Sequence, residues 1–122
     1  MAISQTSLPD ISGSVIFTDS DSIATIAGVT SNSATIYCID VDNSSNAATT
    51  YTKLWNLASG SVTVGTTAPD MIILTPASTR LNIPIPKGVV FGAGLSVASV
   101  TAGGTAGTTS PTSDVVVRIL YV

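Results

Sequence analysis

The sequence predicts an all-β protein: a single-domain antiparallel β-sandwich of the jelly-roll type, with an extended N-terminal arm. The 122 residues include 13 Val, 12 Ile and 18 Thr, which favour strands. Short apolar segments alternate with Gly, Pro, Asn, Asp and Ser at the spacing typical of sandwiches. No segment combines apolar residues at helical spacing with a capping residue, and the sequence contains no Glu. All three observations favour strands over helices.

Residues 1–13 are expected to form the arm, and residues 14–122 the sandwich. The first segment is polar, with isolated apolar side chains at Ile3, Leu8 and Ile11, and Leu8-Pro9-Asp10 is typical of a turn. Terminal segments are usually ordered only where something holds them. We therefore expect a neighbouring molecule to hold the arm, with Ile3, Leu8 and Ile11 as the interface residues.

Short apolar stretches mark the strands of the sandwich, and some of them are expected to merge or to be absent. The expected strands are 14–18, 23–29, 34–41, 49–56, 61–64, 71–75, 81–85, 89–91, 95–101 and 115–121. Pro84 and Pro86 lack the N–H that a central strand donates, so 81–85 is predicted at a sheet edge or a bulge. The segment 115–121 is apolar on both faces apart from Arg118, which predicts a central strand.

A Gly-, Ser- and Thr-rich stretch at 102–113 is predicted to be a flexible loop. Its side chains are too small and too uncharged to form a core. We expect this loop to be exposed to solvent or to be ordered by a neighbouring subunit.

The residue types present exclude several classes of function. Without His or Glu, the chain has no Ser-His-Asp or Cys-His arrangement, no HExxH zinc helix and no paired-Glu glycosidase site. Four basic residues and a net charge of -3 are a poor match for nucleic-acid phosphates. We therefore expect a protein that is not an enzyme, needs no cofactor and does not bind nucleic acid.

The hydropathy pattern favours neither membrane insertion nor secretion. Mean hydropathy is +0.52, yet the longest apolar runs are far shorter than a membrane-spanning helix. The first ten residues contain no Lys or Arg and no apolar stretch typical of a secretory signal. We expect the protein to stay in the cytoplasm where it is made, without a membrane partner.

Two pairs of aspartates are weak candidates for a metal site. Asp40 and Asp42 lie two residues apart, as calcium ligands often do, but the following residues do not match an EF-hand loop. A solvated strand end with an Asx turn is therefore the favoured interpretation, and no metal is predicted. Asp19 and Asp21 repeat the spacing and are predicted to form a turn. Cys38, inside an apolar run, is expected to be a small buried hydrophobic residue rather than a reactive thiol.

Tyr51, Lys53 and Trp55 alternate along one predicted strand, so their side chains share a face. Exposed aromatic rings on a sheet can stack on sugars, and this keeps a carbohydrate-binding module as an alternative function. Aromatic residues are only 5% of the chain, so its single Trp is favoured in the core or in a subunit contact.

Charge is scarce along the whole chain. Charged residues make up 9% of the sequence, against roughly a quarter in ordinary domains. The surface must therefore consist largely of Ser, Thr, Asn, Gly and Ala, which lose water at small cost. This composition favours a subunit that packs against copies of itself or against a larger shell.

Several short motifs follow one another in a fixed order between about residues 34 and 122. The motifs are Ile36-Tyr37-Cys38-Ile39-Asp40-Val41-Asp42-Asn43, Tyr51-Thr52-Lys53-Leu54-Trp55-Asn56, Val64-Gly65-Thr66-Thr67-Ala68-Pro69-Asp70, Ile85-Pro86-Lys87-Gly88-Val89-Val90-Phe91, Gly94-Leu95-Ser96-Val97-Ala98 and Val117-Arg118-Ile119-Leu120-Tyr121. Their order resembles a family of small β-sandwich virion proteins of tailed bacteriophages. The resemblance supplies no catalytic residues.

The resemblance implies a structural component of a virion that is assembled in the host cytoplasm. The first expectation is a capsid decoration or cement protein that binds the major capsid protein, or another virion protein, and stabilises the shell. A neck, tail or fibre subunit of the same particle is the alternative. From the architecture we further expect copies of the chain to form a homotrimer.

Overall fold

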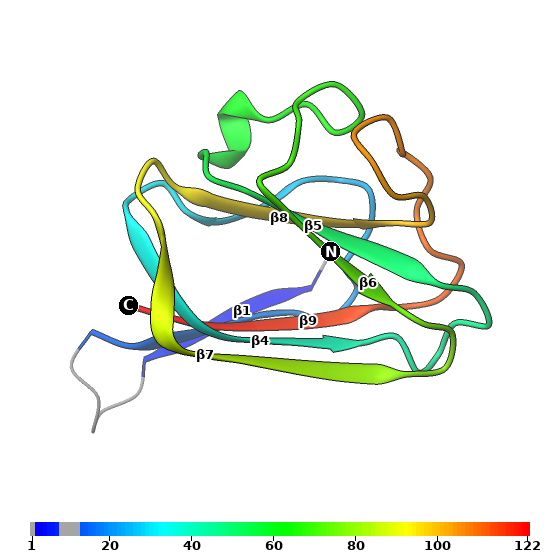
Figure 1. Ribbon diagram of the computed structural model, residues 1–122, viewed down its shortest axis with the longest axis horizontal. Coiled ribbons are helices and arrows are strands. Elements are labelled where there is room, and N and C mark those ends of the chain that lie inside the picture. The colour runs from blue at the N-terminus through cyan, green and yellow to red at the C-terminus, as the bar shows by residue number, and fades with distance from the viewer. Residues whose placement is uncertain (1, 8–12) are drawn as a thin grey trace.

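Two antiparallel β-sheets face each other in the computed structural model, which describes residues 2–7 and 13–122 (Figure 1). The large sheet has five strands in the order β1-β2-β9-β4-β7, and the small sheet has four in the order β3-β8-β5-β6. Without β1, the orders 2-9-4-7 and 3-8-5-6 are those of a jelly roll. The predicted all-β sandwich is therefore confirmed. Among the described residues, no helix is long and apolar enough to cross a membrane.

Most strands lie close to their predicted positions. The strands are β1 (Ile3–Ser7), β2 (Val15–Asp19), β3 (Ala27–Thr30), β4 (Ala34–Asp42), β5 (Thr50–Trp55), β6 (Met71–Thr75), β7 (Arg80–Phe91), β8 (Leu95–Val100) and β9 (Val116–Tyr121). The predicted strands 81–85 and 89–91 form one continuous strand, β7. The predicted strand 61–64 is wrong, because Ser59–Ser61 form a single 3-10 turn followed by loop.

The N-terminal segment differs from the expected arm. Residues Ile3–Ser7 pair antiparallel with β2, from Ile3 opposite Asp19 to Ser7 opposite Val15. This part of the segment is therefore an edge strand of the large sheet, and the boundary drawn at residue 13 does not separate an arm from the domain. All five residues of β1 are exposed, and Ile3 is 41% exposed. Leu8 and Ile11 lie outside the described residues.

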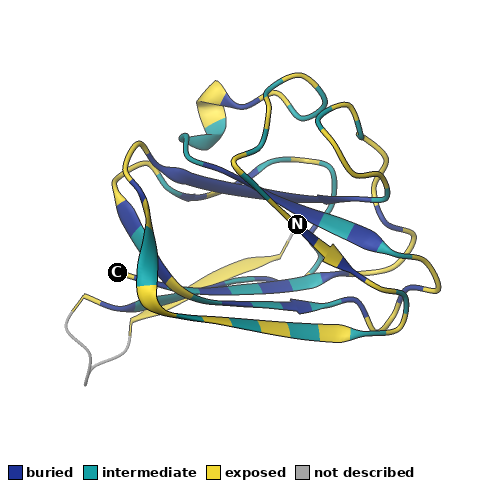
Figure 2. Ribbon diagram, viewed as in Figure 1, coloured by how far each residue is buried: buried dark blue, intermediate teal, exposed yellow. Residues whose placement is uncertain are grey.

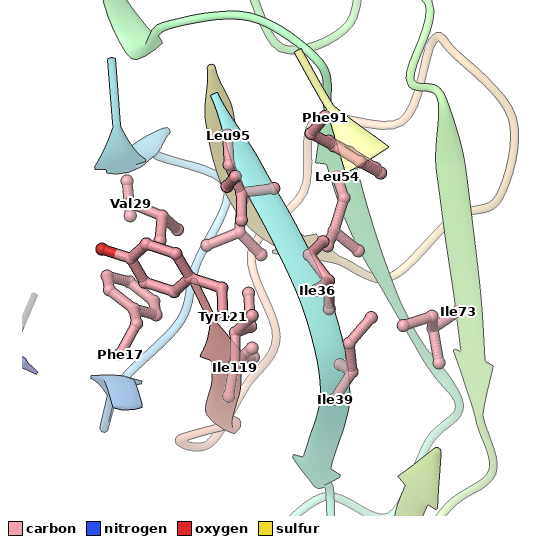
Figure 3. Close-up of a cluster of buried hydrophobic side chains, with 14 of the residues drawn as sticks. Phe17, Val29, Ile36, Ile39, Leu54, Ile73, Phe91, Leu95, Ile119 and Tyr121 are labelled. Carbon is pink, nitrogen blue, oxygen red and sulfur yellow. The ribbon is translucent and has the colours of Figure 1, made fainter. Parts of the chain in front are cut away.

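The space between the sheets is filled by apolar side chains from both inner faces (Figure 3). Strands β2, β4 and β9 contribute alternate residues from one side, and β8 and β5 from the other; β8 is buried along its whole length (Figure 2). Fully burying each large apolar side chain contributes about 1.5–3 kcal/mol. The cluster comprises Phe17, Ala27, Val29, Ala34, Ile36, Ile39, Val41, Leu54, Ile73, Phe91, Leu95, Val97, Val115, Val117, Ile119 and Tyr121.

A bulge in β4 changes which of its residues face the core. The register of β4 against both β7 and β9 shifts between Ile36 and Cys38. Ile36 and Ile39 are buried, whereas Tyr37 is exposed and Cys38 is half-buried beside the Asn82 amide, 3.5 Å from Nδ2 to Sγ. The prediction of a buried Cys38 is therefore wrong, because the extra residue at the bulge places it on the outer side of the sheet.

Two predictions about strand position are confirmed. The proline-containing strand β7 forms one edge of the large sheet, with Leu81, Ile83 and Ile85 packed against the core. Strand β9 is the third of the five strands and pairs with both β2 and β4. Its inward residues are buried, and its outward residues are half-buried. The outward side of this central strand forms the middle of the surface described next.

Candidate interaction surface

The outer face of the large sheet is the side of β2, β9, β4 and β7 that points away from the small sheet. It carries polar groups at one end and apolar groups at the other. Thr35 is the central residue of the apolar end: it pairs with Val90 of β7, and its main-chain N–H and carbonyl both bond to Val122, each at 2.9 Å. Val122, Thr35 and Val90 therefore lie in a row across three segments. Val90 is 64% exposed.

A shallow apolar hollow of about 310 Å³ adjoins this row, lined by Ser14, Tyr37, Leu120 and Val122. Tyr37 is 37% exposed. Its ring rests over Gly88, where an added Cβ would approach Tyr37 Cε1 to 3.0 Å and Thr35 Cγ2 to 2.6 Å, and where φ is +73°. Glycine at position 88 thus leaves room for the Tyr37 ring against the backbone of β7.

At the other end of the face, Asp40 bonds to two residues of β7. Arg80 donates from Nε to Oδ1 at 3.1 Å and from Nη2 to Oδ2 at 3.0 Å, and Asn82 Nδ2 donates to Oδ2 at 3.3 Å. The Asp40 carboxylate raises the pKa of Arg80. Arg118 lies in register with Asp40, and its Nη1 is buried without a hydrogen-bond partner. This end therefore holds one ion pair, Arg80–Asp40, and a second cation at the margin of the apolar area.

The favoured interpretation of Asp42 is confirmed. Its Oδ1 accepts a hydrogen bond from the main-chain N–H of Ser44 at 3.0 Å, which is an Asx turn at the end of β4. The hydrogen bonds from Ser44 lower the pKa of Asp42. Asp40 is engaged by Arg80 instead of sharing a ligand set with Asp42. Within residues 2–7 and 13–122, no group of three or more Cys or Asp side chains is placed to hold a metal ion.

Asp19 and Asp21 form the predicted turn, but Asp19 has an unexpected environment. Its side chain is fully buried at the end of β2, where Oδ1 accepts from the Asp21 N–H at 3.3 Å and Oδ2 has no partner. Burial raises the pKa of Asp19 to about 6. Asp21 accepts a hydrogen bond from the Ala2 N–H, and Ser20 donates from its N–H to the Ala2 carbonyl at 2.7 Å. The turn therefore holds the start of β1.

The row of Tyr51, Lys53 and Trp55 does share one face, as predicted, but that face is covered by loops. Trp55 is fully buried against Val62 and Ala98, and its Nε1 donates to the Thr67 carbonyl at 2.9 Å. The preference for a buried Trp is confirmed. A covered indole offers no surface to a sugar ring, so the feature that suggested carbohydrate binding is absent from this face.

Loop 102–113 is largely exposed to solvent, as one of the two sequence-based alternatives expected, and contacts within its own chain also hold it. Lys53 is fully buried beneath it and donates from Nζ to the Gly107 carbonyl at 3.2 Å. The Thr101 N–H donates to the Thr109 carbonyl at 2.9 Å, and Gly103 lies close to the Tyr51 ring. Burial lowers the pKa of Lys53. No sequence signal marked this lysine as an anchor, because its partner is a main-chain oxygen.

A recess of about 280 Å³ lies between the residues after β4 and those before β9. Its lining contains no titratable side chain, so it offers no acid or base for catalysis. The lining residues are Ser45, Asn46, Ala47, Ala48, Thr50, Thr101, Pro111, Thr112 and Ser113.

No protein-family model matches the chain, and no curated protein sequence matches it significantly.

Proposed function

We propose that this protein is a non-enzymatic structural subunit of a tailed-phage virion, a capsid decoration or cement protein that binds the assembled shell and stabilises it. The assignment to a virion rests on the resemblance over residues 34–122. The observation that carries the mode of action is the exposed apolar end of the large sheet's outer face, formed by Tyr37, Val90, Leu120 and Val122.

The chemistry of this face suits a protein partner. Interface centres are depleted of charge and enriched in aromatic residues, whereas their margins are polar. Here an aromatic ring and three aliphatic side chains adjoin a margin in which Asp40 is already paired with Arg80. These four residues lie on or beside hydrogen-bonded strands, so binding to a partner restricts few additional backbone conformations. The proposed partner is the major capsid protein or another virion protein.

The protein would stabilise a shell because many copies bind to it. Each copy gains about 25 cal/mol per Å² of apolar surface that it buries against the shell, and contacts to more than one shell subunit add through effective concentration. Copies that bridge joints between shell subunits therefore oppose their separation. The homotrimer expected from the sequence is part of this proposal as the state of the protein on the shell, and the number of copies at each attachment site on the particle tests it.

Rebinding to particles from which the protein has been stripped is the test of this function. Val90→Asp places a charge in the apolar end and should lower the affinity for stripped particles about tenfold or more. The matched control is Ser61→Asp, which adds the same charge at an exposed position in the loops over the small sheet. If both variants lose the same affinity for stripped particles, or if neither loses affinity, binding through the large sheet is contradicted.

The same assay distinguishes the other position in the particle. A neck, tail or fibre subunit would rebind separated tails and not emptied capsids, whereas a decoration protein would rebind capsids alone.

A further inference from the structure

The two sheets have four edge strands in the described structure, and three of these edges are protected against pairing with another chain. Strand β7 contains Pro84 and Pro86, which interrupt the row of donors. Strand β3 has four residues and a bulge, and the Gln5 side chain donates to its Val29 carbonyl at 2.9 Å. Strand β1 presents mainly Ser, Gln and Thr, so pairing there would bury little apolar surface.

Strand β6 is the exception. Its sequence, Met-Ile-Ile-Leu-Thr, contains no proline and no charge, and it pairs with β5 on one side only. Ile72 is 40% exposed and Leu74 is 51% exposed, and both point to the outer side of the small sheet. An exposed apolar edge of this kind is a template for strand pairing, which natural proteins otherwise avoid.

We propose that β6 is an interface between two copies of this chain, in which the β6 strands pair antiparallel about a two-fold axis at Ile73. The two small sheets then form one continuous eight-stranded sheet. This interface is separate from the proposed attachment to a virion and does not depend on it.

The sequence of β6 is complementary to itself in this arrangement. With Ile73 opposite its own copy, Ile72 lies opposite Leu74 of the second copy, and Leu74 opposite Ile72. Four exposed aliphatic side chains then meet on the outer side, where cross-strand apolar pairs stabilise a sheet. A one-residue slip would break this match, so the apolar pattern selects the register.

Charge next to the strand favours the same pairing. Asp70 directly precedes β6. With Ile73 opposite its own copy, the two Asp70 side chains lie at opposite ends of the paired strands, whereas parallel pairing would bring them together. Arg80 takes no part, because it is paired with Asp40 on the outer face of the large sheet. The repulsion between like charges therefore favours the antiparallel direction for two copies of this strand.

The mass of the isolated protein at increasing concentration is the first test. We expect a concentration-dependent species of twice the 12.2 kDa chain mass, which Leu74→Lys abolishes. Leu74 is exposed in the single chain, so this variant should fold. Ser61→Lys, with the same added charge, should leave the dimer unchanged. A protein that stays monomeric at all concentrations overturns the proposal. An oligomer that Leu74→Lys leaves unchanged also overturns it. If that oligomer is a trimer, it supports the three-fold assembly instead.

Disulfide formation tests the register. In a Cys38→Ser background, an equal mixture of the Ile72→Cys and Leu74→Cys variants should form mixed disulfide dimers at least several-fold faster than either variant alone. Directly opposed positions bring Cβ atoms within reach of a disulfide, whereas 72 with 72 or 74 with 74 are diagonal neighbours. Equal or absent cross-linking in the three samples overturns the antiparallel pairing. Val90→Asp should retain the dimer, which separates this interface from the shell-binding face.

Discussion

The ammonium group of Lys53 lies 3.2 Å from the main-chain oxygen of Gly107, 54 positions further along the chain, and the lysine side chain is fully buried. This contact joins β5 to the loop 102–113 and covers the outer side of the small sheet at β5. The two outer faces of the sandwich therefore differ: loops cover the small sheet except along its edge strand β6, whereas the large sheet presents its strands. This difference directs the proposed binding to the large sheet.

Replacing Lys53 with Met should raise the stability of the protein at pH 7. Burial lowers the pKa of Lys53, so the folded state disfavours the charged amine. The Gly107 carbonyl is the one hydrogen-bond acceptor that offsets the loss of water around this amine. A hydrophobic residue of similar length removes that cost, worth about 1 kcal/mol or more. In the parent, stability should rise with pH below 10.5, because the unfolded chain holds the proton longer. Urea unfolding from pH 7 up to pH 10.5 measures both effects, and an unchanged slope in Lys53→Met contradicts this account.

Asp19 should produce the opposite dependence in acid. Its pKa is raised to about 6 in the folded protein from 3.8, so the folded state binds the proton more tightly than the unfolded chain. Stability should therefore fall as pH rises from about 4 to about 6, by roughly 2–3 kcal/mol in total. Asp19→Asn should remove the slope and be more stable than the parent at pH 7. Thermal unfolding of both proteins at pH 4 and pH 7 measures this pH dependence. Parallel pH profiles for the parent and Asp19→Asn would show that Asp19 does not cause it.

Two buried threonines should respond differently to the same substitution. Thr75 Oγ1 is buried without a partner, whereas Thr52 Oγ1 bonds to Ser99 Oγ at 3.1 Å. Thr75→Val should leave the unfolding free energy unchanged or raise it, and Thr52→Val should lower it by about 1 kcal/mol or more, because Ser99 loses a partner. Denaturant unfolding compares the pair. Equal losses would indicate that Thr75 has a solvent partner inside the sandwich.

Removal of residues 2–7 should weaken the sandwich without unfolding it. All five β1 residues are exposed, so their loss costs little apolar burial. The deletion does remove Gln5, whose Oε1 accepts from the Tyr121 hydroxyl at 3.2 Å and whose Nε2 reaches β3. We expect a loss of about 1 kcal/mol and an unchanged β-type circular dichroism spectrum. Gln5→Ala should show most of this loss, and complete unfolding of the deletion variant would contradict the account.

The strands of the sandwich were predictable where apolar residues alternate. Met71–Thr75 matches its predicted range, and the prolines of β7 identified an edge. Strand β1 was missed because Ile3–Ser7 is exposed along its length, and such a strand has no apolar face to mark it. The position of Cys38 was predicted wrongly because a bulge shifts the alternation of β4 by one residue. The local sequence does not indicate this bulge.

The surface features were harder to predict than the core. The shared face of Tyr51, Lys53 and Trp55 follows from strand alternation, but its covering by loop 102–113 depends on a long-range hydrogen bond to a main-chain oxygen. The apolar end of the large sheet joins Tyr37, Val90 and Val122 from three segments. Only the strand order of the jelly roll brings them together.

A residue-resolution map of the intact virion tests the central claim most directly. The account predicts that the outer face of the large sheet lies against a shell protein, with Tyr37, Val90 and Leu120 buried in that contact and the loops over the small sheet facing outward. A map in which those three side chains face solvent, or in which the particle lacks this protein, would contradict the account.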